Sequence, residues 1–132
     1  YERYEAKEVS KSLKTFKGAE RRFKETFIGD NVIIDDYAHH PAEVKVTIKA
    51  ARQKYPDKKI VAIFKPHTFS RVEKFAEGFA SSLNLADEAY VMDINYDREN
   101  PEDYPGITPY TIVDKLNNGY YLASDNAQEL LK

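Results

Sequence analysis

The sequence of 132 residues contains no cysteine, so disulfide bonds and thiolate catalysis are excluded for this chain. It also lacks an apolar run that approaches the ~20 residues of a transmembrane helix. We therefore expect a soluble, cytoplasmic domain that has no membrane partner.

Neither sign of charge is in excess. The chain has 20 basic and 22 acidic residues, which leave a net charge of −2. Surfaces that bind nucleic acid are usually strongly basic, so this balance does not favour a nucleic-acid partner. A hydrophobic content of 42% is enough for one core, and the length suits about one domain.

Glycine is scarce, and its spacing excludes two nucleotide-binding loops. None of the five glycines belongs to a G-x-G-x-x-G or a G-x-x-x-x-G-K-[ST] motif. If the chain takes part in phosphate chemistry, most of the phosphate-binding backbone must come from another domain. The ends agree with this, because the chain begins without Met and stops in the helical pattern "NAQELLK". We expect residues 1–18, where Val9, Leu13 and Phe16 form one helical face, to be the tail of a preceding domain. Residues 19–132 would then be a domain truncated at its C-terminal end.

Residues 21–36 predict a β-hairpin, because two strand-like segments flank Gly29-Asp30-Asn31. From residue 32 onward, strands are expected to alternate with helices. The further predicted strands lie at 59–64, 88–94 and 119–123, and the helices lie at 41–55, from about 70, and at 111–116. This order predicts an α/β fold, with a mostly parallel sheet and helices on both faces, preceded by a hairpin with an antiparallel strand.

Two details of this fold can also be predicted. The continuous apolar run "KIVAIF" is typical of a strand that is covered on both faces. Ser70 and Glu73 have the S-x-x-E spacing of a capping box, which would begin the helix there. We therefore interpret Ser70 as a cap and not as a nucleophile.

Histidines follow two of the predicted strands. His39 and His40 come after the strand at 32–35, and His67 comes after the strand at 59–64. Ligands of parallel sheets bind beyond the carboxyl ends of the strands. The helix that starts near Ser70 would add free backbone N–H groups, which favour phosphate or carboxylate, and Arg71 would add a cation. The sequence therefore predicts one crevice that binds an anion.

Each of these residues also has an ordinary structural interpretation. Asp35 and Asp36 could end a strand and begin a turn, and His40 could cap the helix that starts at Pro41. A metal site at His39-His40 is not favoured, because adjacent residues in an extended chain point apart. A serine hydrolase is excluded by the lack of a G-x-S-x-G elbow.

Four segments carry a family resemblance, namely "FKGAERRF", "IIDDYAHHPAEV", "IFKPHTFSR" and "DINYDREN". Their order and spacing resemble the C-terminal domain of bacterial Mur ligases, and "DDYAHHP" resembles the alanine-adding members. The resemblance implies a Rossmann-like domain that closes over two others. A central P-loop domain, of which residues 1–18 would be the tail, holds ATP and Mg²⁺, and an N-terminal domain holds the UDP-sugar.

The implied reaction is the ATP-dependent joining of L-alanine to UDP-N-acetylmuramate through an acyl phosphate, in peptidoglycan precursor synthesis. The chain alone should be inactive, and its protein partners would be its own N-terminal and central domains. Two rival interpretations remain. One is a stand-alone α/β module that binds a small anion or nucleotide without catalysis, and the other is a nucleotide-dependent oxidoreductase domain, which the missing glycine motif disfavours.

The resemblance also implies roles for individual residues. Asp36 would accept hydrogen bonds from the ATP ribose, and one of Arg21 and Arg22, with Arg22 favoured, would face the nucleotide. The residues expected at the reacting centre are Tyr37 and His39, which would line it, and His67 and Arg71, which would hold the carboxylate or the incoming alanine. No residue of this chain is expected to bind a metal ion.

Overall fold

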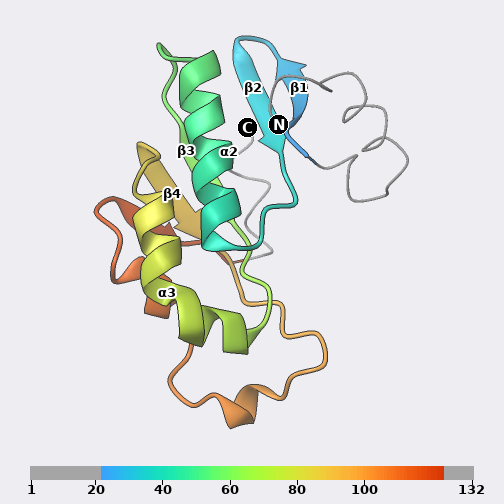
Figure 1. Cartoon of the computed structure of the whole chain (residues 1–132), viewed down its shortest axis with the longest axis vertical. Coiled ribbons are helices and arrows are strands. Elements are labelled where there is room, and N and C mark those ends of the chain that lie inside the picture. Colours follow the sequence, from blue (N-terminus) through green and yellow to red (C-terminus); the bar gives the residue numbers. More distant parts are fainter. Residues whose placement is uncertain (1–21, 124–132) are drawn as a thin grey trace. The chain divides into compact units, whose positions relative to one another are not determined.

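The computed structural model of the chain describes residues 22–123 (Figure 1). The chain divides into two compact units between Ala38 and His39. The first unit contains a hairpin, and the second contains a parallel sheet and the helices. The helices predicted near the two ends of the chain, and Arg21, lie outside the described residues.

The hairpin pairs β1 (Lys24–Ile28) with β2 (Asn31–Asp35) in antiparallel orientation, as predicted. Ile28 lies opposite Asn31, so the turn consists of Gly29 and Asp30 alone, and Asn31 belongs to the strand. Gly29 has a φ of 59°, a backbone conformation that glycine adopts without steric cost. The sequence Gly-Asp therefore allows the short turn that sets the register of the hairpin.

The second unit is built on three parallel strands in the order β3-β4-β5. The strands are β3 (Val61–Phe64), β4 (Glu88–Val91) and β5 (Gly119–Tyr121). The helices are α2 (Pro41–Lys54) before β3, α3 (Phe69–Leu83) between β3 and β4, and α4 (Tyr110–Val113) between β4 and β5. A 3-10 turn at Pro101–Asp103 lies in the loop after β4. The predicted class, an α/β fold with a mostly parallel sheet and an antiparallel hairpin before it, is confirmed.

The core lies between the sheet and the helices, where α2 and α3 pack side by side (Figure 1). Its most deeply buried side chains include Val72, Phe79, Leu83, Val91 and Ile112. The Phe79 ring on α3 meets the Phe64 ring on β3 with centroids 4.8 Å apart. Because fully burying one such side chain stabilises a fold by about 1.5–3 kcal/mol, these contacts fix α3 on the sheet.

The other face of the sheet is more exposed. Val61, Ile63 and Tyr120 point to that face and are 43%, 42% and 46% exposed. Right-handed connections in the order β3-β4-β5 place α3 and α4 on the same face. Within residues 22–123 the helices therefore cover one face, which differs from the expected strand covered on both faces.

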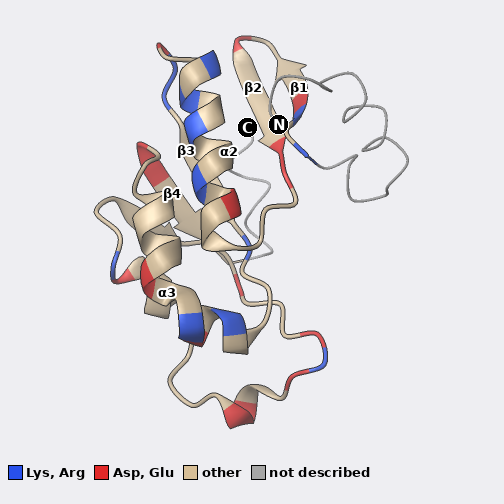
Figure 2. Ribbon diagram, viewed as in Figure 1, with Lys and Arg blue, Asp and Glu red and all other residues tan. Residues whose placement is uncertain are grey.

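Charges along α2 follow the helix dipole. Glu43 lies in the first turn, and Arg52 and Lys54 lie in the last turn, where the carbonyl groups favour cations. Figure 2 shows the basic residues spread along this helix. Among the helices described in residues 22–123, none is both long and apolar enough to cross a membrane.

The amino ends of β3 and β4 are tied to the end of α2. Arg52 donates hydrogen bonds to the Asp87 carboxylate at 3.0 Å and to the Leu85 carbonyl at 3.1 Å. The backbone N–H of Ile60 donates to the same carboxylate at 2.7 Å. The hydrogen bond from Arg52, followed by the one from Ile60, lowers the pKa of Asp87 below its ordinary value.

Candidate functional site

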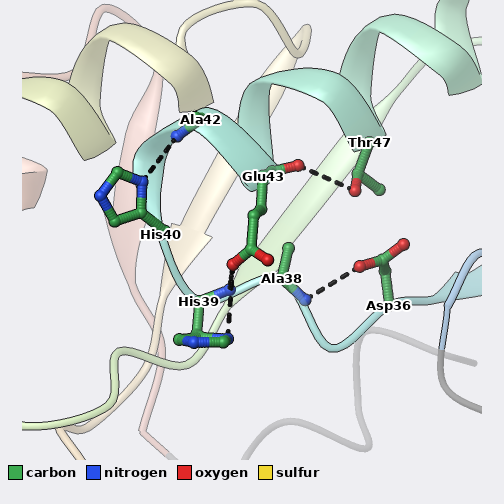
Figure 3. Close-up of polar contacts among 7 residues, drawn as sticks. All are labelled: Asp36, Ala38, His39, His40, Ala42, Glu43 and Thr47. Carbon is green, nitrogen blue, oxygen red and sulfur yellow. Dashed lines mark hydrogen bonds and ion pairs between the residues drawn. The ribbon is translucent and has the colours of Figure 1, made fainter. Parts of the chain in front are cut away.

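The first unit contributes Asp36, which closes the hairpin. Its Oδ2 accepts a hydrogen bond from the backbone N–H of Phe23 at 2.9 Å. Its Oδ1 accepts one from the backbone N–H of Ala38, also at 2.9 Å (Figure 3). A carboxylate offers about four lone-pair positions, so acceptor capacity remains for a hydroxyl of a ligand. Tyr37, which is 50% exposed, and the exposed Arg22 belong to the same unit.

The start of α2 carries both histidines of the "AHHP" segment. His40 is the N-cap, and its Nδ1 accepts a hydrogen bond from the backbone N–H of Ala42 at 3.3 Å (Figure 3). His39 Nδ1 lies 3.4 Å from Oε1 of Glu43, and the same oxygen accepts from the His39 backbone N–H at 3.3 Å. Glu43 therefore contacts His39 twice, which restricts the orientation of the imidazole. The interpretation of His40 as a helix cap is confirmed.

The start of α3 differs from the expected capping box. The N-cap is Thr68, whose Oγ1 accepts a hydrogen bond from the backbone N–H of Arg71 at 3.3 Å. Helix α3 thus begins at Phe69, and Ser70 is its second residue. The prediction that Ser70 and Glu73 form the cap is wrong, because the helix begins two residues earlier and Ser70 lies inside its first turn, where it cannot be the N-cap.

The backbone N–H groups at the start of α3 were expected to be open to an anion, and the structure corrects this. The Glu99 carboxylate accepts hydrogen bonds from the N–H groups of Phe69 and Ser70. Burial raises the pKa of Glu99, but hydrogen bonds from the Ser70 side chain, these two amides and the Tyr104 hydroxyl outweigh burial and leave it below its ordinary value. The first amides of α3 therefore have an anionic partner within the chain.

The start of α2 packs against the middle and the C-terminal half of α3. The His40 ring meets the Phe75 ring edge-on with centroids 4.9 Å apart, and Pro41 lies against Gly78, where an added Cβ would be 3.1 Å from the proline ring. The buried Ser82 hydroxyl donates to the Pro41 carbonyl at 2.8 Å. Phe75, with a φ of −119° and a ψ of 19°, lies at a kink in α3, so the start of α2 packs beside the part of α3 from this kink onward, and Arg71 lies before the kink.

The junction between β3 and α3 carries two donor side chains, His67 and Arg71. Arg71 and His67 are both partly exposed, and no ion pair to Arg71 is found among residues 22–123. Within the same residues, no group of three or more acidic or histidine side chains could hold a metal ion. The arrangement suits the binding of a carboxylate or phosphate by side chains.

Comparison with known proteins decides the family. The family model for the Mur ligase glutamate ligase domain matches residues 21–131. The chain belongs to the Mur ligase family. This Mur ligase domain is 60% identical, over 93 residues, to UDP-N-acetylmuramate–L-alanine ligase from Ligilactobacillus salivarius (strain UCC118). The matched segment is 70% of the chain and 21% of that relative, so the domain represents about a fifth of the relative's length.

Solved structures agree with the fold of the Mur ligase domain. UDP-N-acetylmuramate–alanine ligase from Thermotoga maritima is 29% identical with a TM-score of 0.63, over 98% of this chain and 27% of that one. A murein peptide ligase from Psychrobacter arcticus is 22% identical with a TM-score of 0.66, over 92% and 26% of the two chains. The second likeness, at this low identity, supports the fold alone.

Two acidic residues of the Mur ligase domain escaped the sequence analysis. Glu43 could have been found, because it lies four residues after His39 at a predicted helix start, which is the spacing of a pair on one helical face. Glu99 gave no such signal, since it lies thirty residues from Phe69 along the chain. Its contact exists only because the loop after β4 returns to the end of β3.

Proposed function

We propose that the Mur ligase domain is the C-terminal domain of an ATP-dependent ligase that joins L-alanine to UDP-N-acetylmuramate in peptidoglycan precursor synthesis. The observation that carries the proposal is the 60% identity to a UDP-N-acetylmuramate–L-alanine ligase. A central domain would hold most of the ATP and Mg²⁺, and an N-terminal domain would hold the UDP-sugar. The domain alone would be inactive, and the whole protein would work in the cytoplasm, where these nucleotides are available.

On the nucleotide side, Asp36 would accept hydrogen bonds from the ribose hydroxyls. Its two hydrogen bonds to backbone amides fix the carboxylate and leave acceptor positions for such donors. Arg22, or Arg21 beside it, would face the nucleotide phosphates as a cation.

On the substrate side, the reaction has two steps. A carboxylate oxygen of the sugar attacks the γ-phosphorus of ATP and ADP leaves, and then the alanine nitrogen attacks the acyl carbon while phosphate leaves. Both steps place negative charge on oxygens, which donors and cations stabilise when they are fixed in advance. We assign this role to His67 and Arg71.

The second step also releases a proton from the alanine nitrogen. A neutral imidazole can accept this proton, and His39 lies at the start of α2 with a carboxylate partner, Glu43. We assign His39 and Tyr37 to the lining of the reacting centre.

The full-length protein provides the test of this function. Wild type should release phosphate only when ATP, UDP-N-acetylmuramate and L-alanine are all present. Arg71→Ala should lower kcat/KM for L-alanine about 10- to 100-fold, because it removes a charge-assisted hydrogen bond of about 1.5–3 kcal/mol.

Lys49→Ala, on the exposed side of α2, is the control and should stay within about twofold of wild type. Phosphate release by wild type that does not depend on alanine would refute the proposed reaction, and the absence of any phosphate release would favour a binding module. Normal turnover in Arg71→Ala would refute the role of Arg71 alone.

A further inference from the structure

The segment Asn95–Glu99, in the loop after β4, lies against the junction between β3 and α3. Asn95 pairs with His67 in an isolated parallel bridge. The Thr68 N–H donates to the Asn95 carbonyl at 2.6 Å, and the Asn95 N–H donates to the Pro66 carbonyl at 2.9 Å. The backbone on both sides of His67 is therefore hydrogen-bonded to this segment.

Glu99 continues the contact into α3. Its carboxylate accepts from the N–H groups of Phe69 and Ser70, the latter at 3.2 Å. Hydrogen bonds to an ionised acceptor are roughly twice as strong as those between neutral groups. One side chain thus closes the N-terminus of α3 and joins it to the loop.

Aromatic rings reinforce the same contact. The Phe69 ring stacks on Tyr104 at a centroid distance of 6.0 Å and an interplanar angle of 15°. Tyr96 lies on the same ring at 6.1 Å. The Asn95–Glu99 segment therefore meets the start of α3 through both polar and apolar groups.

The turn between these contacts has a strained backbone. Thr68 has a φ of 71° and a ψ of 140°, which a β-branched residue rarely adopts. Such a conformation persists only where its surroundings enforce it. Here the Thr68 N–H is bound by Asn95, and the next two amides are bound by Glu99. His67 precedes the strained residue directly, and Arg71 follows it by three residues.

We propose that Glu99 is a positioning residue, which holds the strained turn at Thr68 so that His67 and Arg71 keep one fixed arrangement toward the anionic substrate group. This inference rests on the proposed function, which assigns that group to these two side chains. Because Glu99 occupies the amides of Phe69 and Ser70, the substrate anion meets side chains at this helix start and not the backbone.

The test compares Glu99→Ala and Glu99→Gln with Glu102→Gln, an exposed glutamate of the same loop, in the full-length protein. Kinetics with L-alanine and amide hydrogen exchange of residues 66–72 are measured for each variant. Glu99→Ala should raise the KM for L-alanine, or lower kcat/KM, at least about tenfold, because small displacements of binding groups cost large factors in rate. Glu99→Gln keeps an acceptor oxygen, so its kcat/KM for L-alanine should lie between the values of Glu99→Ala and wild type.

Hydrogen exchange gives an answer that does not depend on activity. The amides of Phe69 and Ser70 should exchange faster in Glu99→Ala and should be unchanged in Glu102→Gln. In Glu99→Ala, unchanged exchange, or faster exchange with wild-type kinetics, would overturn the proposal. A lower KM for L-alanine would also overturn it, because it would show that Glu99 competes with the substrate. If wild type shows no alanine-dependent reaction, the proposed function fails while exchange still tests the contact.

Discussion

The starts of α2 and α3 follow strands in the same way, yet they are built by different means. The start of α2 is local: His40 caps it, Pro41 is its first residue, and Glu43 contacts His39 from the first turn. The start of α3 combines the local cap Thr68 with a carboxylate from a distant loop, Glu99. Local contacts hold the first arrangement in a relaxed backbone, whereas the second includes a strained residue that needs support from elsewhere.

The largest expected effect comes from separating the start of α2 from α3. Gly78→Val adds a branched side chain where even a Cβ would lie 3.1 Å from Pro41. Overpacking of this kind should lower the free energy of unfolding by about 2–3 kcal/mol, measured by denaturant unfolding of the full-length protein. Amides at the start of α2 should also exchange faster than in wild type.

Gly78→Ala is the matched control for that substitution. Its steric conflict is offset by the gain of about 0.5–1 kcal/mol from replacing a helical glycine, so its stability should be close to that of wild type. Wild-type stability in Gly78→Val would show that Pro41 can move aside and that the start of α2 is not rigidly joined to α3.

Substitutions at the two N-caps should change the free energy of unfolding by smaller amounts and in opposite directions. His40→Ala removes a relaxed cap and should destabilise by about 1 kcal/mol. Thr68→Gly loses a hydroxyl but relieves a φ of 71°, so it should stabilise by about 0.5–1 kcal/mol in the same unfolding assay. Its turnover should nevertheless fall, because the relaxed turn no longer fixes His67 and Arg71.

Thr68→Ser, which retains the hydroxyl, is the control for both the free energy of unfolding and the turnover, and it should resemble wild type in both. Destabilisation of equal size in His40→Ala and Thr68→Gly would remove the distinction between a relaxed and a strained helix start.

The smallest expected effect is a pH dependence of stability at the start of α3, which the Glu99 carboxylate should cause. Hydrogen bonds hold the pKa of Glu99 below its ordinary value of 4.5. The contribution of ionised Glu99 to the free energy of unfolding is therefore fully present above pH 4.5, and it is lost as the pH falls through the lower pKa of the folded state. For an anion at a helix N-terminus this contribution is about 0.3–1 kcal/mol.

Hydrogen exchange of Phe69 and Ser70, compared between wild type and Glu99→Gln at each pH, measures this effect. The difference between the two proteins should shrink as the solution becomes acidic. The neighbouring groups that could complicate the comparison are Tyr104, whose pKa is raised by burial and by Glu99, and Glu73 beside it. A difference that stays constant below pH 4.5 would contradict the assignment to Glu99.

Features that depend on local contacts could be predicted from the sequence, whereas features that depend on distant contacts could not. The hairpin turn at Gly29, the helix start at Pro41 and the His40 cap all depend on neighbouring residues, and all were predicted correctly. The predicted capping box at Ser70 was wrong, although the S-x-x-E spacing is present in the sequence. The N-cap is Thr68, two residues earlier, and it adopts a backbone conformation that its residue type disfavours.

The site shows the same limit. The sequence predicted His39 and His67 after two strands of one sheet, but within residues 22–123 β2 pairs only with β1, and only His67 follows a strand of the parallel sheet. The start of α2 packs against the middle and the C-terminal part of α3. Glu99 could not be anticipated, because its position depends on how the loop after β4 folds back. The exposure of Ile63 was missed for a similar reason, since an apolar run does not reveal which face a helix will cover.

The two backbone hydrogen bonds of Asn95 have a consequence for protein engineering. A designer who grafts the segment Pro66–Arg71 onto another α/β scaffold would transfer its side chains without the support of its backbone. The transferable unit is a pair of segments, 66–71 and 95–99, that are far apart in the gene and adjacent in the protein. Recombination between family members that separates these segments is therefore expected to yield chimaeras that fold but bind the substrate anion poorly.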